Sequence, residues 1–297
     1  MENKIIQNIE HIRAWIKNSP DPRAFKTNNE FMHVYVQIMN YTLYFIRLVI
    51  SLTKDKESSE RGVTKHKAII SGLVVRISKL YDGFAKHIAD HELELAAIFS
   101  RLIFETEVRL HYLLSSKNKK KSIRSFILGS YKPEKEILID LKSKSKTRKL
   151  IPIEQRIKRK VLSRLKKDGI TQKELLNNTR WNIDGKNFRQ LLKDLNRELQ
   201  YYYIFGSMSH HIHGDWYEIS LYHLEKENGR YFPNLNYDTP DPRLVGPISG
   251  LILNRLIEFL KYTKTDPDNY ISDIISSLFA VCYGYDDSHE EFLSKQN

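Results

Sequence analysis

The sequence predicts an all-α protein: a helical bundle that carries a basic helical insertion. Apolar residues recur mostly at helical spacing, and strict alternation of apolar and polar residues is rare. Gly (12) and Pro (9) are scarce among 297 residues, which argues against a β-sandwich, a collagen or a disordered chain. Positive charge is concentrated in one segment, so the remainder of the chain is a near-neutral helical body.

Composition limits the class of protein further. The chain has 48 Lys and Arg against 36 Asp and Glu, a formal charge of +12, and its 41% hydrophobic residues are enough for a buried core. At roughly 100–200 residues per domain, one large domain or two modest ones are expected. The single cysteine, Cys282, excludes an internal disulfide framework and a cysteine-based zinc cluster.

Four helices are predicted in the N-terminal part, over residues 5–17, 29–54, 64–88 and 90–115. A Pro-Asp-Pro turn separates the first two helices, and the polar run 55–62 ends the second. Asp90 is expected to be the N-cap of the fourth helix, because Glu92 and Glu94 would then lie near the positive end of its dipole.

The most lipophilic stretch, residues 34–52, is predicted to be a largely buried core helix. It is too polar for a membrane span, because five polar residues interrupt it: Gln37, Asn40, Thr42, Arg47 and Ser51. The N-terminus leads into a polar helix without a charged-then-apolar signal segment. We therefore expect a cytoplasmic protein that does not associate with a membrane.

The C-terminal part is predicted to contain helices over residues 188–208, 247–262 and 269–283. Short strands are expected at 218–222 and 231–232, inside a long loop over 214–241 that is rich in Pro, Asn and Gly. The predicted domains are a bundle core, residues 1–116 and 186–297, and a basic helical insertion, residues 117–185.

The insertion is basic because residues 117–167 contain 19 Lys or Arg and only four acidic residues. The net charge of this segment is +15, which leaves −3 for the rest of the chain. Such a field attracts polyanions without reading their sequence. It predicts nucleic-acid binding, with a solvated surface run, an acidic protein or a lipid surface as alternatives. The candidate contact residues are Lys119, Lys120, Lys121, Arg156, Arg159 and Lys160.

A capping box over residues 171–174 opens a short helix, and a second helix begins at Phe188. Together with the basic helix before them, they match a helix-turn-helix module in part. The turn between them is long and contains Trp181 and Ile183 where a tight glycine turn is usual. Plain helical packing is therefore the alternative.

Arg101, Glu105 and Arg109 stand four residues apart, so they lie along one stripe of a helix whose other residues are strongly apolar. Buried charges need partners. Two interpretations follow. Either the three side chains form an ion-pair ladder that satisfies itself, or they line a polar cleft that binds an anion such as phosphate.

Three of the 11 histidines, His210, His211 and His213, follow the aromatic segment 201–205. Histidine titrates near pH 6.5 and serves as an acid, a base or a metal ligand. Gly214 is expected to end this helix, so the alternative is that the imidazoles stabilise its C-terminus. No metal or cofactor is predicted, although a metal enzyme using the three histidines and Asp215 is a rival hypothesis.

Two of these regions together carry a resemblance. The pattern is an apolar helix with Arg101 and Glu105 and a later helix with Tyr203, Ser209, His213 and Gly214. It resembles a family of bacterial helical proteins of uncharacterised function, which looks like a distant relative of the HEPN superfamily. The resemblance covers about residues 64–116 and 186–216. HEPN domains are helical bundles, and many are metal-independent ribonucleases that act as toxins or in defence against phage, often as dimers.

The HEPN nuclease motif is an Arg followed after four to six residues by a His on the same helix. Only Arg61 and His66 have that spacing here, and they straddle the polar break before a helix, with Gly62 between them. Arg109 precedes His111 too closely. The cation and the base of a nuclease would therefore come from different helices.

The leading hypothesis is a HEPN-like defence or toxin protein that engages RNA, with metal-independent cleavage as its activity. His213 or His210 would be the general base or acid, Arg101 and Arg109 would hold phosphate, and Glu105 would orient one of them. The alternatives are a non-catalytic nucleic-acid-binding or scaffold protein and a nucleotide sensor. A homodimer and an operon-encoded partner are further candidates for its assembly.

Overall fold

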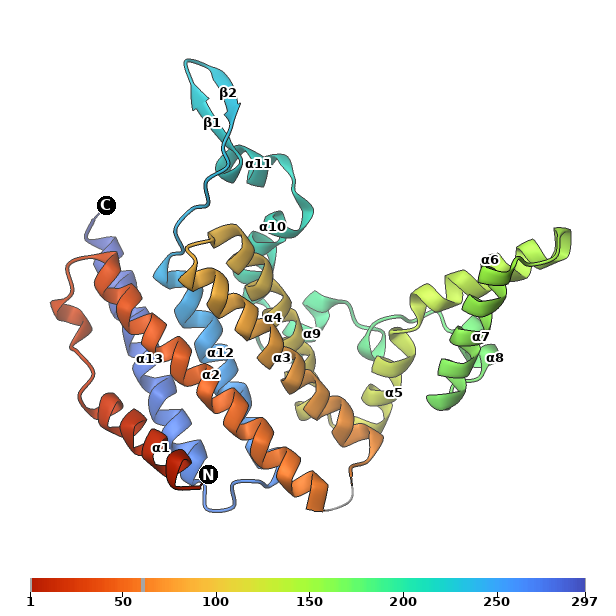
Figure 1. Cartoon of the computed structure of the whole chain (residues 1–297), viewed down its shortest axis with the longest axis horizontal. Helices are drawn as coiled ribbons and strands as arrows, with labels where there is room; N and C mark the ends of the chain where they lie inside the picture. Colours follow the sequence, from red (N-terminus) through yellow and green to blue (C-terminus); the bar gives the residue numbers. More distant parts are fainter. Residues whose placement is uncertain (1, 60–61, 297) are drawn as a thin grey trace. The chain divides into compact units, whose positions relative to one another are not determined.

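The computed structural model describes residues 2–59 and 62–296 and confirms the all-α class (Figure 1). In that part of the chain there are thirteen α-helices and one two-stranded hairpin. The chain forms two compact units, which we call the body unit (residues 1–114 and 199–297) and the basic unit (residues 115–198). The predicted insertion, residues 117–185, lies inside the basic unit, which extends further to include one more helix.

Six long helices build the body unit: α1 (Glu2–Lys17), α2 (Asn28–Ser59), α3 (Lys65–Ala89), α4 (Leu93–Ser115), α12 (Pro242–Thr263) and α13 (Tyr270–Ser294). α12 packs along both α2 and α13, and α2 also packs against α3 (Figure 1). Large side chains from these helices fill the core, among them the fully buried Tyr35, Phe45, Tyr81 and Phe259. The phenol of Tyr81 is satisfied by the Ser249 hydroxyl at 2.7 Å, so even the polar atom of this ring has a partner.

Residues Asn28–Lys54 of α2 are long and apolar enough to cross a bilayer, judged by length and composition. Half of the apolar window is buried inside the fold, as in the core helix of a globular protein. The helix packs against α3, α12 and α13.

α12 and α13 approach closely at Gly246, where an added β-carbon would collide with the Asp286 carboxylate. Asp286 accepts a hydrogen bond from the Tyr35 hydroxyl, and burial raises the pKa of its carboxyl to about 6. A carboxyl whose pKa is raised by folding stabilises the protein at low pH, and this contribution is lost as the pH rises through 6.

We therefore expect Asp286→Asn to stabilise the protein by about 2–3 kcal/mol at about pH 7.5, because the amide accepts the same hydrogen bond without a buried charge. The gain should vanish at about pH 2.5, below the pKa of the carboxyl in both states, where it is neutral whether the protein is folded or unfolded. Urea unfolding at the two pH values measures the difference, with the exposed neighbour Asp287→Asn as control. Destabilisation by Asp286→Asn at the higher pH would contradict the argument.

The basic unit contains α5 (Lys119–Gly129), α6 (Lys132–Thr147), α7 (Pro152–Lys167), α8 (Gln172–Asn177) and α9 (Phe188–Asp194), with a 3-10 turn at Ile183–Gly185. The Thr171 hydroxyl caps α8 by accepting the Glu174 N–H, but the Glu174 carboxylate turns to Arg124 instead of completing the capping box. Ser122 and Ser125 of α5 bind Asp184, which holds the long connection between α8 and α9. These contacts favour plain helical packing over a helix-turn-helix module.

The region predicted as a loop, residues 214–241, is more regular than expected. Residues 218–222 are helical and not a strand, because the Asp215 side chain caps the helix α11 (Trp216–Tyr222). The strand at 231–232 is confirmed within β2 (Arg230–Pro233), which pairs antiparallel with β1 (Leu224–Glu227). Asn228 and Gly229 both have positive φ, as the tight hairpin turn between these strands requires.

Several predicted helix boundaries are also wrong. α2 continues to Ser59, into the polar run that was expected to end it, α12 begins at Pro242 and not at 247, and α13 continues to Ser294 and not only to 283. Asp90 is the C-cap of α3, and α4 begins three residues later because His91 adopts a left-handed backbone with φ +59°. The predicted helix 188–208 is interrupted after α9, where Asn196 has φ +57°. A wide π turn (Tyr201–Gly206), a 3-10 turn (Ser207–Ser209) and α10 (His210–His213) follow in its place.

Candidate functional site

Arg101, Glu105 and Arg109 form an ion-pair ladder on α4. Glu105 Oε1 lies 3.0 Å from Arg101 Nη2, and its Oε2 lies 3.0 Å from Arg109 Nη2. The Arg101 side chain is 7% exposed and the Arg109 side chain 38%. The carboxylate therefore bridges a buried cation and a partly exposed one, as the self-satisfying interpretation predicts.

Arg101 also joins α4 to the π turn. Its Nη1 donates a 2.7 Å hydrogen bond to the Phe205 carbonyl, and the guanidinium lies over the Phe205 ring. The Ser209 hydroxyl donates to the same carbonyl at 2.6 Å. Burial lowers the pKa of Arg101, while the Glu105 carboxylate acts in the opposite direction. Because its donors bind Glu105 and Phe205, Arg101 acts as a structural link.

His210 forms a pair with Asp215 at the solvent-facing side of α10. The distance from Nδ1 to Asp215 Oδ2 is 2.6 Å, and the two side chains are 37% and 44% exposed. The hydrogen bond from His210 lowers the pKa of Asp215, so the carboxylate is ionised and holds the proton on Nδ1. Nε2 is then left as the acceptor, which is the arrangement of a histidine base oriented by a carboxylate.

His211 turns inward toward Glu218. Its Nδ1 lies 3.5 Å from Glu218 Oε1, and His223 Nε2 lies 3.7 Å from the same oxygen. Burial lowers the pKa of His211, and the nearby Glu218 carboxylate opposes this shift. The inward pair was missed from the sequence, although Asp215 and Glu218 have the spacing of a capping box, which would have placed Glu218 on a helix.

His213 is exposed just before Gly214, whose left-handed conformation ends α10 as predicted. Among the described residues, no hydrogen bond or ion pair joins Arg101 or Arg109 to any of the three clustered histidines. A site shared by these cations and the imidazoles, which the leading hypothesis requires, therefore stays a prediction. Arg61, the cation of the Arg61–His66 spacing, lies outside the described residues.

The described residues contain no group of three or more His, Cys, Asp or Glu side chains arranged to hold a metal ion. His210 and His211 instead face different carboxylates, Asp215 and Glu218.

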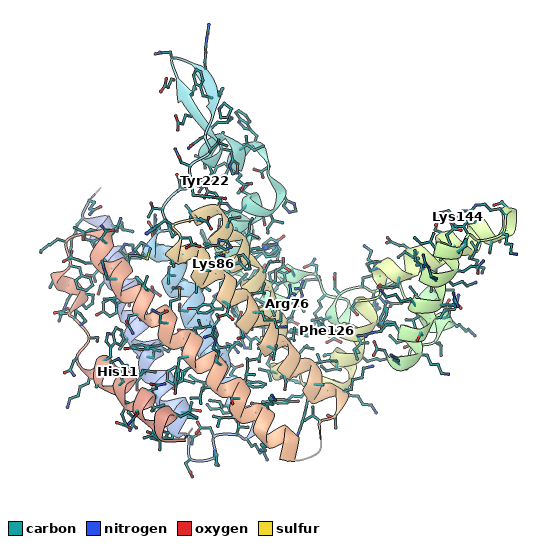
Figure 2. The ribbon with its side chains drawn as sticks, viewed as in Figure 1. His11, Arg76, Lys86, Phe126, Lys144 and Tyr222 are labelled. Atoms are coloured by element: carbon teal, nitrogen blue, oxygen red, sulfur yellow. The ribbon has the colours of Figure 1, made fainter. Side chains whose placement is uncertain are left out.

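The basic unit presents its cations to solvent. It holds 25 Lys and Arg against nine Asp and Glu, a net of +16 that leaves −4 for the body unit. None of the 19 cations within residues 117–167, a fully described segment, is buried, and Figure 2 labels Lys144 of α6 among them. The predicted contact residues Lys119, Lys120 and Lys121 form the first turn of α5, where Lys120 and Lys121 are exposed.

α7 carries the densest cationic surface. Arg156, Arg159 and Lys160 are exposed and lie opposite its buried Val161 and Leu165, as helical spacing requires. Glu154, at the start of the same helix, is bound by both terminal nitrogens of Arg148 at 2.6 and 2.8 Å. We call Arg156, Arg159 and Lys160 the α7 basic face; within the described residues none of the three has an acidic partner.

The sequence model of one protein family matches residues 67–231, more than half of the chain. Its description is a family of unknown function, DUF5677. The chain belongs to the DUF5677 family. No curated protein and no solved structure matches the chain.

The DUF5677 match contains the Arg101 ladder, the whole basic unit and the histidine segment, and it ends inside the β1–β2 hairpin. α1, α2, α12 and α13 lie outside it. The predicted membership of an uncharacterised family is confirmed at this level.

Proposed function

We propose that this DUF5677 protein binds RNA through the basic unit, without using the Arg101 ladder as a phosphate site. The α7 basic face is the observation that carries the proposal, since its three cations are exposed and lack an acidic partner among the described residues. The phosphate groups of a polyanion would supply the negative charge that these cations lack within the protein. RNA is the nucleic acid that the HEPN resemblance favours, and a role in phage defence or as a toxin follows from the same resemblance. A cytoplasmic location remains a proposal that rests on the sequence.

Binding of this kind releases counterions and weakens steeply with salt. The test is the anisotropy of a labelled single-stranded RNA titrated with the full-length protein at about 50 and 200 mM KCl. We expect the dissociation constant to rise at least tenfold, roughly, between the two salts. A constant that does not change, or no binding at the lower salt, would contradict the proposal.

The geometry favours binding over a nucleotide sensor at the Arg101–Glu105 stripe. The Arg101 guanidinium binds Glu105 and the Phe205 carbonyl, so its donors are not directed at a free anion. A homodimer remains a proposal that follows from the HEPN resemblance alone. An operon-encoded partner is a further proposal.

A second candidate function, metal-independent RNA cleavage, is favoured by one observation: the exposed His210–Asp215 pair. In this reaction Nε2 would take the proton of a ribose 2′-hydroxyl, and the 2′-oxygen would bond to the adjacent phosphorus as the P–O5′ bond breaks. The leaving 5′-oxygen would take its proton from water. His213 is the other candidate for the base, but it lacks an orienting carboxylate among the described residues. The reaction also needs a cation at the phosphate that is not the occupied Arg101.

We expect His210→Ala to abolish cleavage of a labelled RNA in EDTA, with RNA affinity changed less than about twofold, because the histidine acts on the reacting hydroxyl and not on the backbone. Asp215→Asn should lower the rate strongly, since the amide does not hold the same tautomer. His213→Ala tests the other candidate, and it should leave cleavage unchanged if His210 is the base. Equal cleavage by wild type and His210→Ala would remove His210 as the base.

A further inference from the structure

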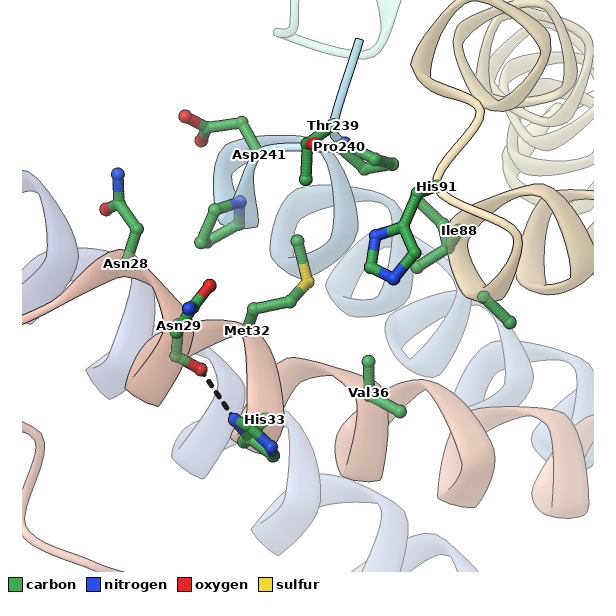
Figure 3. A pocket seen from close by; sticks show the side chains of 12 residues that line it. Asn28, Asn29, Met32, His33, Val36, Ile88, His91, Thr239, Pro240 and Asp241 are labelled. Carbon is green, nitrogen blue, oxygen red and sulfur yellow. Dashed lines mark hydrogen bonds between the residues drawn. The ribbon is translucent and has the colours of Figure 1, made fainter. Parts of the chain in front are cut away.

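A cavity of about 630 Å³ opens in the body unit, between the start of α2, the end of α3 and the segment that leads into α12. Figure 3 shows Met32 near its centre, with Asn28 and Asp241 on one side and His91 and Ile88 on the other. Its size is that of a small-molecule site. The basic unit contributes no residue to it, so it is independent of the RNA surface proposed above.

We propose that this cavity binds an uncharged ribonucleoside. The class follows from three properties of the lining: its charge, its hydrogen-bonding groups and its apolar centre.

The charge of the lining favours an uncharged ligand over a phosphorylated one. No Lys or Arg is among the described residues that line the cavity, whereas Asp241 contributes a carboxylate. Arg243 holds that carboxylate with contacts of 3.0 and 3.2 Å. Burial opposes ionisation of Asp241, but the hydrogen bonds from Arg243 outweigh it and lower the pKa of the carboxyl. The pair of Asp241 and Arg243 is close to neutral, so it offers a phosphate no excess positive charge. The remaining lone pairs of the carboxylate can accept hydrogen bonds from the paired hydroxyls of a ribose.

Asn28 lies at the same end and has a defined orientation. His289 Nε2 is 2.9 Å from Asn28 Oδ1, and an amide oxygen only accepts, so the imidazole is the donor. The NH₂ group of Asn28 is then left to donate to a ligand hydroxyl. Asn28 and Asp241 thus offer a donor and an acceptor at the proposed ribose end.

The ring nitrogens of the two histidines that line the cavity can form hydrogen bonds with the edge of a nucleobase. His33 Nδ1 is 2.8 Å from the Asn29 carbonyl oxygen, so Nδ1 carries the hydrogen and Nε2 is an acceptor. His91 contributes its ring from the left-handed position at the end of α3, a conformation that costs a non-glycine residue roughly 1 kcal/mol. Figure 3 shows the His91 ring directed toward the centre of the cavity.

Between the two ends the lining is apolar. Met32, Val36 and Ile88 surround the centre of the cavity. A planar heterocycle matches such a surface, because its faces need van der Waals contact while its edges need hydrogen bonds. A sugar alone would leave this apolar surface without a partner.

The experiment measures binding of adenosine, guanosine, cytidine and uridine to the full-length protein by calorimetry. We expect at least one to bind with a dissociation constant below about 1 mM, and its 2′-deoxy form and its 5′-monophosphate each to bind at least about tenfold more weakly. If none of the four binds, or if the monophosphate binds as tightly as the nucleoside, the proposal is wrong.

Two variants locate the site. Met32→Trp fills the centre of the cavity, and Asp241→Ser removes the carboxylate while keeping an N-cap side chain for α12. Each should weaken nucleoside binding at least about tenfold and leave RNA binding by the basic unit unchanged. Asn40→Trp, at an exposed position of the same helix α2 outside the cavity, is the control. Undiminished nucleoside binding by Met32→Trp would overturn the assignment.

Discussion

Replacing Arg156, Arg159 and Lys160 together by Gln is expected to weaken RNA binding roughly 10- to 100-fold at physiological salt. Gln has nearly the helix propensity of Lys and Arg, so α7 should keep its structure. All three positions are exposed and lie opposite the buried side of the helix, so the substitutions remove charge without disturbing the packing of the basic unit. The measurement is the anisotropy titration of the wild-type protein repeated with the variant.

The salt dependence gives this prediction a second readout. Each phosphate contact on a single strand contributes roughly −0.7 to the slope of log affinity against log salt. Loss of three contacts should therefore flatten the slope by about 2. An affinity that falls without a change of slope would mean that the variant is misfolded and has not lost phosphate contacts.

A second triple variant with the same change in net charge tests whether RNA contacts α7 itself or responds only to the overall charge of the protein. Lys17, Lys26 and Lys261 are exposed cations of the body unit, and their joint replacement by Gln lowers the net charge by the same three units. We expect this control to change RNA affinity by less than about threefold. If both triple variants lose affinity equally, RNA binding is not localised on α7.

The long helices could be predicted because each repeats its apolar residues over many turns. For that reason the prediction lies within one residue of both ends of α3, of the start of α2 and of the end of α12, whereas the other ends of α2 and α12 differ by five residues. Residues 195–241 were harder, since the elements there are short and depend on single residues. Asp215 starts α11 by capping it, and Asn228 and Gly229 make the hairpin turn. The capping residue and the turn residues are both visible in the sequence, but the many Asn and Gly residues of this region favour a loop prediction.

The candidate site was predictable in part for a similar reason. The ladder of Arg101, Glu105 and Arg109 follows from the spacing of one helix, and it is present. Arg101 donates its hydrogen bond to the main-chain carbonyl of Phe205. Every residue has such a carbonyl, so the sequence does not indicate this bond. Likewise, spacing does not tell that His211 turns inward toward Glu218, because the wide π turn before it shifts the direction of every later side chain.

The largest effect on stability is expected at a buried ion pair between α4 and α12. The Glu107 side chain is 0% exposed and that of Arg255 4%. Arg255 Nε lies 2.8 Å from Glu107 Oε1 and forms an ion pair with it. The two atoms are not aligned as a hydrogen bond. Arg255 also forms an ion pair with Glu258. Because both charges have been taken out of water, removal of one leaves the other buried with less compensation.

Glu107→Ala is therefore expected to lower the free energy of unfolding by about 3–5 kcal/mol, a large share of the 5–15 kcal/mol that is typical of a folded protein. The measurement is urea unfolding followed by the helical circular dichroism signal. Glu258→Ala removes a carboxylate that is 36% exposed and belongs to the same Arg255, so it is the matched control, with an expected loss below about 1 kcal/mol. A loss of that small size in Glu107→Ala would show that water reaches the pair.

The double variant Glu107→Leu with Arg255→Met separates two contributions to the free energy of unfolding. One is the loss caused by a buried charge without its partner, and the other is the net contribution of the intact ion pair. Apolar residues of similar volume often replace a buried ion pair without loss, or with a gain of about 1–4 kcal/mol. If the double variant recovers the stability lost by Glu107→Ala, the pair contributes specificity between α4 and α12 and not net stability. If it is as unstable as the single variant, the pair itself stabilises the body unit. RNA binding by the double variant should equal that of wild type in either case, because the α7 basic face lies in the other compact unit.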